Sequence, residues 1–502
     1  MGNEKSNKLE LNELVQNERH DVDIVEKLMG SMGRWQVCIC FALMLCKIPI
    51  AWHQLSVLII APPIASFCID NVTDTCSPNC SDIVFDRSLF TETIQSQWNL
   101  VCNKSQLPHV SQTLVLLGVL IGNLVFGMIA DKFGRRKPLI AAVVIQSVGS
   151  IAAAFVPWFW IFSVCRFIAA LGTGGMIVTS FVLLIEIIGS KWRTHIAILF
   201  QIPFDLGQAS LGLIGYFFRD WQQIQLVISI PPILLLSYYW ILPESPRWLL
   251  LNKKAEDAIH VLRTAARFNK VQQHTIESDV GVYIRKRKNV IVQKGRFYDI
   301  LRSRIMRTRT ICLWCNCIAS GFCLYGNSQY VGHLGGNMFV NIALSAIMQI
   351  PGTLSSVWFI QHFGLRYTLI VGNFATGCLF FLVALIPPHY NWVKVVFAIM
   401  VMYTMSVCFS TLYFSSGQLF PTIVRNVGVS TCLMTGRMGM MIAPFVVGLG
   451  LIKIWFPPAI FSTAAFIGAV SAYHLPKTRS VSLPETIEEV EGLTNELIER
   501  RA

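Results

Sequence analysis

The chain has 502 residues, of which 54% are hydrophobic and only 14% are charged. Soluble domains carry about 25% charged residues, so this composition excludes a string of water-soluble domains and predicts an integral membrane protein. The formal net charge of +13 does not indicate nucleic-acid binding, because the basic residues gather on one side of the apolar stretches.

Twelve apolar stretches are each long enough for a helix that crosses a bilayer, which takes about 18 residues or more. The sequence shows no catalytic constellation, phosphate-binding loop or metal-ligand cluster. It therefore predicts an all-α polytopic membrane protein that is not an enzyme and uses no metal or cofactor. The stretches begin near Trp35, Val110, Leu139, Trp158, Thr194, Trp221, Arg309, Asn337, Tyr367, Trp392, Val427 and Phe456.

These spans divide the chain into two six-helix halves, with a long loop after the first span, a linker between the halves and a segment at each end. The predicted bounds are 1–34 for the cytoplasmic N-terminal segment, 35–242 for the first half, 62–108 for its loop, 243–308 for the cytoplasmic linker, 309–475 for the second half and 476–502 for the cytoplasmic tail.

Basic residues are distributed unevenly over the predicted loops. The loop 62–108 holds only Arg87 and Lys104, whereas the linker 243–308 is rich in lysine and arginine throughout. Cytoplasmic loops of membrane proteins carry the excess of basic residues. The loop 62–108 is therefore predicted to be extracellular, and both termini are predicted to be cytoplasmic.

The same loop contains the chain's three Asn-x-Ser/Thr sequences, at Asn71, Asn79 and Asn103. Four cysteines lie in the loop or at its edge, namely Cys68, Cys76, Cys80 and Cys102. Glycosylation and disulfide bonds both belong to the extracellular side. We therefore expect a glycosylated, disulfide-bonded loop, with the pairing of the cysteines left open.

The two halves repeat each other at a fixed spacing. Glu186 and Arg193 have counterparts in Gln418 and Arg425, since 418 − 186 and 425 − 193 are both 232. Such parallel six-span repeats are typical of major facilitator carriers, in which the substrate site lies between the halves near the middle of the membrane.

Four short motifs narrow the family. Residues 127–137 (GMIADKFGRRK) resemble the loop motif of the major facilitator superfamily. Residues 242–249 (LPESPRWL), 418–428 (QLFPTIVRNVG) and 483–486 (LPET) resemble signatures of its organic-ion transporter family, which includes organic cation, organic anion and carnitine carriers. The resemblance implies a plasma-membrane carrier that moves a small organic ion by alternating access, as a uniporter or an exchanger. Its partners would be that ion and the lipid bilayer.

Charged residues of these motifs lie at the predicted cytoplasmic ends of the spans, where ion pairs that form and break are suited to a gate. The resemblance implies such a network in the first half, and Gln418 and Arg425 occupy the equivalent place in the second. Because the family usually has a glutamate at the position of Gln418, the second latch is expected to be weaker. The first-half residues are Asp131, Arg135, Arg136, Glu186, Arg193, Glu244 and Arg247.

Three ionisable residues lie deep in predicted spans, where they normally face a cavity or a partner. Arg437 and Asp205 occupy equivalent positions of the two halves, because 437 − 205 is again 232, and Lys47 lies in the first span. The family's anion and carnitine carriers have arginine where Arg437 stands, and its cation carriers have aspartate. These residues are predicted to contact the substrate, with Tyr325 and Phe445 as an aromatic wall.

The residues leave alternatives open. Arg437 could be a structural arginine paired with Asp205 or with the backbone, and Lys47 could likewise pair with Asp205. The excess of positive charge favours an anion or a zwitterion such as a carnitine-like compound. A cation carrier of the same family and a non-transporting membrane receptor or sensor with the carrier fold are the other functions considered.

Overall fold

The structure is a computed structural model, and it describes residues 24–62, 64–68, 83–271, 275–287, 298–421 and 424–476. Within this part of the chain, eleven helical stretches are long and apolar enough to cross a membrane. They correspond to the predicted spans 1–6 and 8–12. Asn71, Asn79, Cys76 and Cys80 lie outside the described residues.

The first half contains six spans, three of which are broken. The spans are α3 Arg34–Leu45 with α4 Lys47–Leu55 and α5 Val57–Ile60, α7 Leu107–Phe133, α8 Arg136–Phe155, α9 Phe159–Ile187, α10 Ser190–Leu199 with α11 Ile202–Phe217, and α12 Trp221–Ser229 with α13 Tyr238–Ile241. Proline lacks the amide hydrogen that a helix interior needs. Pro203 stands beside the break between α10 and α11, and Pro231 begins a 3₁₀ turn between α12 and α13.

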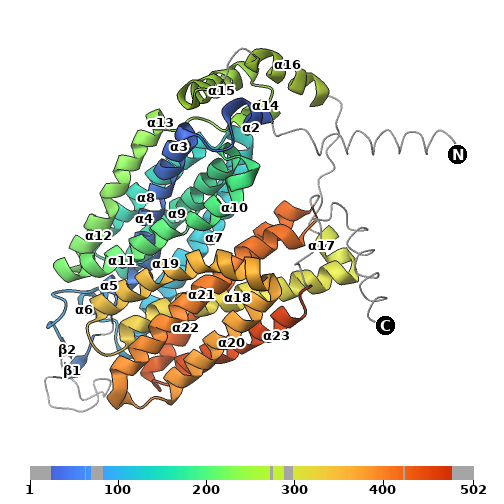
Figure 1. The fold of residues 1–502 in the computed structure, drawn as a ribbon. Helices are drawn as coiled ribbons and strands as arrows, with labels where there is room; N and C mark the ends of the chain where they lie inside the picture. The colour runs from blue at the N-terminus through green and yellow to red at the C-terminus, as the bar shows by residue number, and fades with distance from the viewer. Residues whose placement is uncertain are drawn as a thin grey trace, which may run out of the picture.

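The second half contains six longer helices. They are α18 Arg304–Tyr330, α19 Met338–Phe363, α20 Leu365–Leu385, α21 Asn391–Leu419, α22 Arg425–Gly448 and α23 Phe456–Tyr473. The two halves lie side by side and meet where α11 packs on α19 and α7 packs on α22 (Figure 1). The chain therefore has the predicted all-α architecture of twelve membrane helices in two six-helix halves.

The helix α18 occupies the place of the predicted seventh span, although it is not among the eleven apolar stretches. Its polar side chains are shielded by neighbouring helices. Asn316 and Asn327 are fully buried. Asn316 Nδ2 donates to Ser471 Oγ at 2.6 Å, and Asn327 Nδ2 donates to the carbonyl of Ala398 at 2.8 Å. A helix whose polar side chains are shielded from lipid inside the protein can cross a bilayer despite its lower hydropathy.

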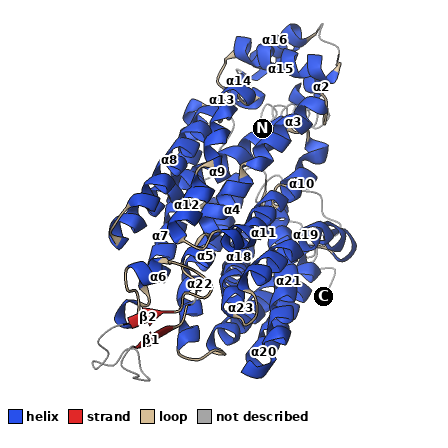
Figure 2. Ribbon diagram, turned by 90° about the vertical axis from the view of Figure 1, so that its left-hand side faces the viewer, coloured by secondary structure: helices blue, strands red, loops and turns tan. Residues whose placement is uncertain are grey.

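Short elements cover the two ends of the molecule. The predicted extracellular end carries α6 Ile94–Gln97 and an antiparallel pair of strands, β1 Ser66–Cys68 and β2 Ile83–Phe85, with Phe67 opposite Val84 (Figure 2). The predicted cytoplasmic end carries α2 Ile24–Met29, α14 Pro246–Leu251, α15 Ala255–Asn269 and α16 Ile276–Arg287, while α17 Asp299–Arg302 packs on α18. Cys68 and Cys102 each take part in a disulfide bond.

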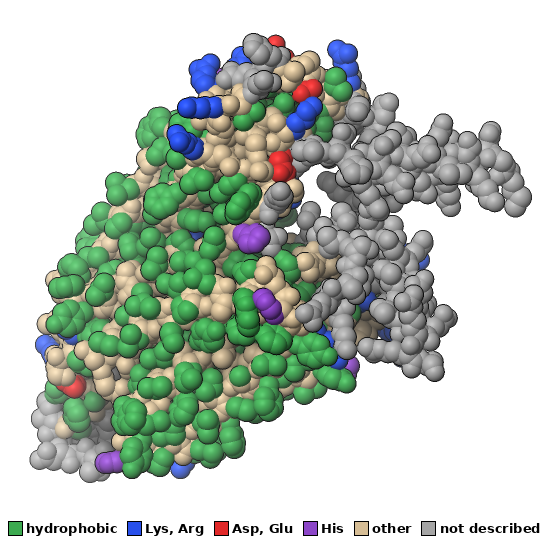
Figure 3. Space-filling view, viewed as in Figure 1, with side chains coloured by type: hydrophobic (Ala, Val, Ile, Leu, Met, Phe, Trp, Pro, Cys, Tyr) green, Lys and Arg blue, Asp and Glu red, His purple; other side chains and the backbone are tan. Residues whose placement is uncertain are grey.

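The surface reflects this division. Large apolar side chains cover the body of the molecule, whereas charged side chains gather over α15 and α16 (Figure 3). Trp240, for example, is 79% exposed and Leu234 is 76% exposed. Exposed apolar side chains at this density suit contact with lipid tails and not with water.

The linker helices belong to the first half. Asn269 at the end of α15 accepts a hydrogen bond from the amide of Trp35 at 3.0 Å and donates to the carbonyl of Met29 at 2.8 Å. Lys27 in α2 forms an ion pair of 3.4 Å with Asp279 in α16. These contacts make α2, α15 and α16 a platform on the predicted cytoplasmic end of the first half.

The duplication seen in the sequence also sets the packing around the site. Gly207 in α11 and Gly439 in α22 are again 232 residues apart. A Cβ on Gly207 would lie 2.8 Å from the carbonyl oxygen of Ile48, and one on Gly439 would clash with the carbonyl oxygen of Ile318. Both glycines therefore let the fifth span of their half approach the first span closely, two residues beyond Asp205 and Arg437.

Candidate functional site

A cavity lies between the two halves and is lined by residues from both. Its ionisable lining residues are two cations and two tyrosines, and no aspartate or glutamate lines it among the described residues. The lining residues are Lys47, Ile50, Gln54, Leu55, Ile177, Gln201, Phe204, Gln208, Leu324, Tyr325, Ser328, Gln349, Phe409, Tyr413, Arg437 and Met440.

Arg437 projects into this cavity from the middle of α22. Its only hydrogen bond to a described residue is a weak one, from Nη1 to the sulfur of Met440 at 3.7 Å. It forms no ion pair with Asp205, which excludes the alternative of a structural arginine paired with that residue. A guanidinium with most of its donors free is prepared to bind a carboxylate or sulfonate through two parallel hydrogen bonds.

Lys47 adds a second positive charge on the facing half. Its side chain is 7% exposed, and Nζ lies 4.5 Å from the centre of the Phe200 ring. It is close enough to Arg437 and Asp205 for their charges to interact, but it forms no ion pair within 4.0 Å with Asp205. The cavity is therefore lined by a basic side chain from each half.

Asp205 lies behind this wall and does not line the cavity. The residue is 1% exposed, and neither carboxylate oxygen accepts a hydrogen bond from a described residue. Its neighbours Phe204 and Gln208 line the cavity instead. The geometry therefore does not support the predicted direct contact between Asp205 and the substrate.

The aromatic wall differs in part from the expected one. Tyr325 lines the cavity, and its hydroxyl donates to the carbonyl of Gln54 at 3.0 Å. Phe445 is 40% exposed and does not line the cavity. It follows Arg437 by eight residues, which turns it by about 80° around a helix of ~3.6 residues per turn. Phe409 and Tyr413 in α21 line the cavity, and no motif in the sequence marked them.

Hydrogen bonds join the two halves next to the cavity. Gln349 Nε2 in α19 donates to Gln208 Oε1 in α11 at 3.0 Å. Toward the predicted extracellular end, Gln112 in α7 donates to the hydroxyl of Tyr325 in α18. Gln112 also donates to the carbonyl of Gln54 within its own half. These contacts hold the halves together around the cavity.

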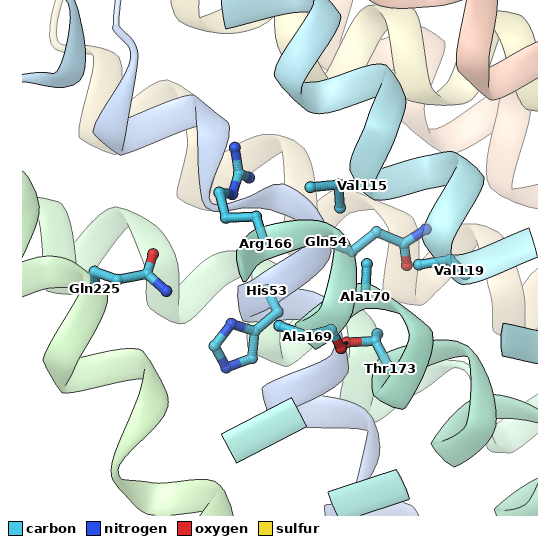
Figure 4. A pocket seen from close by; sticks show the side chains of 9 residues that line it. All are labelled: His53, Gln54, Val115, Val119, Arg166, Ala169, Ala170, Thr173 and Gln225. Carbon is cyan, nitrogen blue, oxygen red and sulfur yellow. Dashed lines mark hydrogen bonds between the residues drawn. The ribbon is translucent and has the colours of Figure 1, made fainter. Parts of the chain in front are cut away.

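Arg166 lies deeper, inside the first half, as a structural residue. It is 4% exposed and donates to Gln112 Oε1 at 3.0 Å and to Ser56 Oγ at 3.1 Å. Figure 4 shows it at a small pocket that His53 and Gln225 also line. Arg166 thereby anchors the glutamine that reaches across to Tyr325.

A network at the predicted cytoplasmic end of the first half centres on Arg135. Its Nη1 is 2.7 Å from Asp131 and its Nη2 is 3.0 Å from Glu186, and Glu244 accepts the amide hydrogen of Arg135 at 2.6 Å. Burial alone would lower the pKa of Arg135, but the hydrogen bonds and charges of Glu186 and Asp131 raise it. The arginine therefore remains charged and joins three segments that are far apart in the sequence.

The other predicted gate residues lie around this centre. Arg136 donates to the carbonyl of Tyr239 and lies 4.9 Å above the centre of its ring. Gln418 is partly buried near the end of α21, and Arg425 begins α22. The hydrogen bonds and ion pairs of Arg135 and Arg136 all join residues of the first half and the linker.

Arg193 and Arg247 lie beside Glu26, a residue that no sequence pattern marks. Glu26 Oε2 in α2 accepts hydrogen bonds from the amide of Ser190 at 3.0 Å and from its hydroxyl at 2.8 Å. Burial alone would raise the pKa of Glu26, but these hydrogen bonds and the charges of the two arginines lower it. Glu26 belongs to no motif, so only the docking of α2 reveals its place.

The comparisons with known proteins agree with this architecture. The family described as "Sugar (and other) transporter" matches residues 91–489. A Drosophila melanogaster "Organic cation transporter protein" is 32% identical over 82% of this chain and 76% of its own length. The mouse "Solute carrier family 22 member 3" is 33% identical over 80% of this chain and 72% of its own, and pig "Organic anion transporter 3" is 30% identical over 86% and 79%.

Solved structures show the same fold. The xylose transporter of E. coli in an inward-open conformation superposes with a TM-score of 0.63 at 16% identity, over 91% of this chain and 99% of that chain. A second structure of this transporter, a proton:xylose symporter of the major facilitator superfamily, has a TM-score of 0.61. The matched proteins are transporters and not enzymes. With these matches over most of its length, the chain belongs to the organic-ion transporter family of the major facilitator superfamily.

Proposed function

We propose that this multi-pass membrane protein is a plasma-membrane carrier for small organic anions or zwitterions, which it moves by alternating access. The preference for an anionic or zwitterionic substrate over a cationic one rests on one observation. The guanidinium of Arg437 faces the cavity without a carboxylate partner, and Lys47 lines the same cavity from the other half. Because no acidic side chain lines the cavity among the described residues, a compound that brings its own anionic group completes the site.

The relatives bear names of both kinds, organic cation and organic anion transporters. An organic cation is therefore the second candidate, and the aromatic side chains of Tyr325 and Tyr413 could receive it. A bare cation would nevertheless meet two positive charges at the cavity wall, and their repulsion favours the anion or zwitterion.

A competition experiment separates these candidates. The compounds are propane-1-sulfonate, betaine and tetramethylammonium, whose charges stay constant between pH 5 and 8. Uptake of labelled betaine into cells that express the protein should be saturable and should be inhibited by unlabelled betaine and by the sulfonate. Inhibition by tetramethylammonium alone would support the cation carrier and contradict the proposed charge preference.

The Arg135 network and the neighbouring Arg193 are proposed to act together as the cytoplasmic gate, because the network joins the ends of four spans without contacting the cavity. Asp131→Asn and Arg193→Ala should each lower the maximal rate of uptake several-fold and leave KM nearly unchanged, since they act on the conformational step. Gln418→Glu restores the family's carboxylate and should strengthen the second latch. Uptake at the wild-type rate in all three variants, at matched surface expression, would rule out this gate.

The proposed topology places the loop 62–108 outside the cell and both termini inside. Glycosidase treatment should therefore lower the apparent mass of the protein made in animal cells. Asn71→Gln with Asn103→Gln should remove most of that shift. Asn79 should contribute little, because the middle residue of its Asn-x-Ser sequence is Cys80. An apparent mass unaffected by the enzyme, in cells that glycosylate other surface proteins, would argue against the orientation.

A further inference from the structure

The least satisfied charged group near the site is the carboxyl group of Asp205. It is 1% exposed in the middle of the fifth span, and no described residue donates a hydrogen bond to either of its oxygens. A buried carboxylate without a partner costs several kcal/mol. A carboxylate in this position should therefore be neutralised by a positively charged species that binds reversibly.

One cation in the described part of the chain lies near Asp205. Lys47 on α4 and Gln201 at the start of α11 are the neighbours that act on its charge, yet neither meets ion-pair or hydrogen-bond geometry. Among the described residues, α5, α12 and α19, which also pack on α11, place no charged side chain beside it. Arg437 belongs to the opposite half and acts on Lys47.

These surroundings favour a proton over a metal cation. Sodium or another hard cation requires several oxygen ligands, and near Asp205 the unpaired group of Gln208 is its amide nitrogen, a donor. The ammonium of Lys47 would also repel a metal ion. A proton requires a single oxygen, and it converts the carboxylate into a neutral acid.

We propose that Asp205 binds a proton that is carried together with the anionic group of the substrate, which makes the protein a proton-coupled carrier. The step is the reversible addition of one proton from cavity water to one carboxylate oxygen, and no other bond changes. This inference rests on the proposed function, because it assigns the driving gradient to the same cavity.

The coupling follows from the charges around the cavity. A negative Asp205 behind Lys47 weakens the attraction of the wall for an anion, and protonation of Asp205 leaves Lys47 and Arg437 fully available. Because linkage is reciprocal, a bound anion must equally favour the proton. Lys47 and Asp205 lie in one half and Arg437 in the other, so rocking of the halves changes their separation and allows release on the far side.

The experiment uses the purified full chain in liposomes, with labelled propane-1-sulfonate and labelled betaine as probes. An inward proton gradient of one pH unit should drive accumulation of up to about tenfold in the wild type, since one pH unit corresponds to ~1.4 kcal/mol. A dye inside the liposomes should report proton entry together with the probe. Replacing sodium with potassium should change neither result.

Asp205→Asn mimics the neutral, protonated aspartate at every pH. It should retain exchange of labelled for unlabelled probe between the two sides and lose the accumulation driven by the proton gradient. Its KM should no longer improve as the pH falls. Glu92→Gln makes the same chemical change at an exposed position and should behave as the wild type, which controls for reconstitution.

Failure of the proton site and failure of the proposed function give different results. Exchange in the wild type without any response to the proton gradient, or accumulation driven by sodium, would overturn the proton site and leave the proposed function intact. An Asp205→Asn variant that still accumulates the probe with the gradient would also overturn it. Absence of exchange for both probes in the wild type would contradict the proposed function itself. If Asp205→Asn fails to fold, the wild-type gradient and dye measurements still decide.

Discussion

Arg437→Asp is expected to invert the charge preference of the carrier. A charge-assisted hydrogen bond contributes about 1.5–3 kcal/mol, which corresponds to roughly ten- to a hundredfold in affinity. Inhibition of uptake by propane-1-sulfonate should therefore weaken by at least that factor, while tetramethylammonium should become an inhibitor. Arg437→Lys keeps the charge but loses the planar pair of donors, so its loss should be partial.

Two comparisons make this result specific. Arg87→Asp makes the same change of charge on an exposed part of the predicted extracellular loop and should leave the inhibition profile unchanged. Surface labelling should show equal amounts of each variant. If organic anions do not inhibit wild-type transport of tetramethylammonium, and Arg437→Gln does not change it, the protein is a cation carrier and the proposed charge preference is wrong.

Arg135→Leu should nearly abolish turnover while the protein still reaches the membrane. The Arg135 side chain is 9% exposed and that of Glu186 is 19% exposed, and removing one partner of a buried ion pair costs about 3–5 kcal/mol. The loss should appear in the maximal rate of uptake and not in KM, because the network does not line the cavity.

Lys132→Gln is the matched control for this prediction. Lys132 is an exposed basic neighbour whose Nζ lies 5.4 Å from the centre of the Phe133 ring, and its removal should change uptake little. Adding Glu186→Gln to Arg135→Leu removes the stranded carboxylate and should restore stability in detergent. Equal uptake rates for Arg135→Leu and Lys132→Gln would contradict the role of the network.

The architecture could be predicted from the sequence because long apolar stretches, basic loops and a duplication are each visible along one chain. The ends of α18 show where this reasoning reaches its limit. The predicted seventh span begins near Arg309, but the helix begins at Arg304, since charged residues outside the bilayer can extend a helix without adding hydropathy.

The site was predictable only in part. The spacing of 232 residues identified Asp205 and Arg437 as equivalent positions, and Arg437 does face the cavity. The same spacing says nothing about rotation within a half, so it did not show that Asp205 lies behind Lys47 or that Phe445 turns to the surface. Contacts such as Glu26 with Ser190 depend on tertiary docking, which leaves no local pattern in the sequence.

The central claim is that the chain transports organic ions through the cavity at Arg437, and exchange by the purified protein tests it most directly. Liposomes that contain the protein and are loaded with unlabelled betaine should take up labelled betaine faster than empty liposomes. That uptake should saturate, and it should be lost in liposomes that contain Arg437→Gln. Binding of labelled betaine to the purified protein with no exchange across the liposome membrane would contradict the carrier and would instead indicate a receptor that retains the carrier fold.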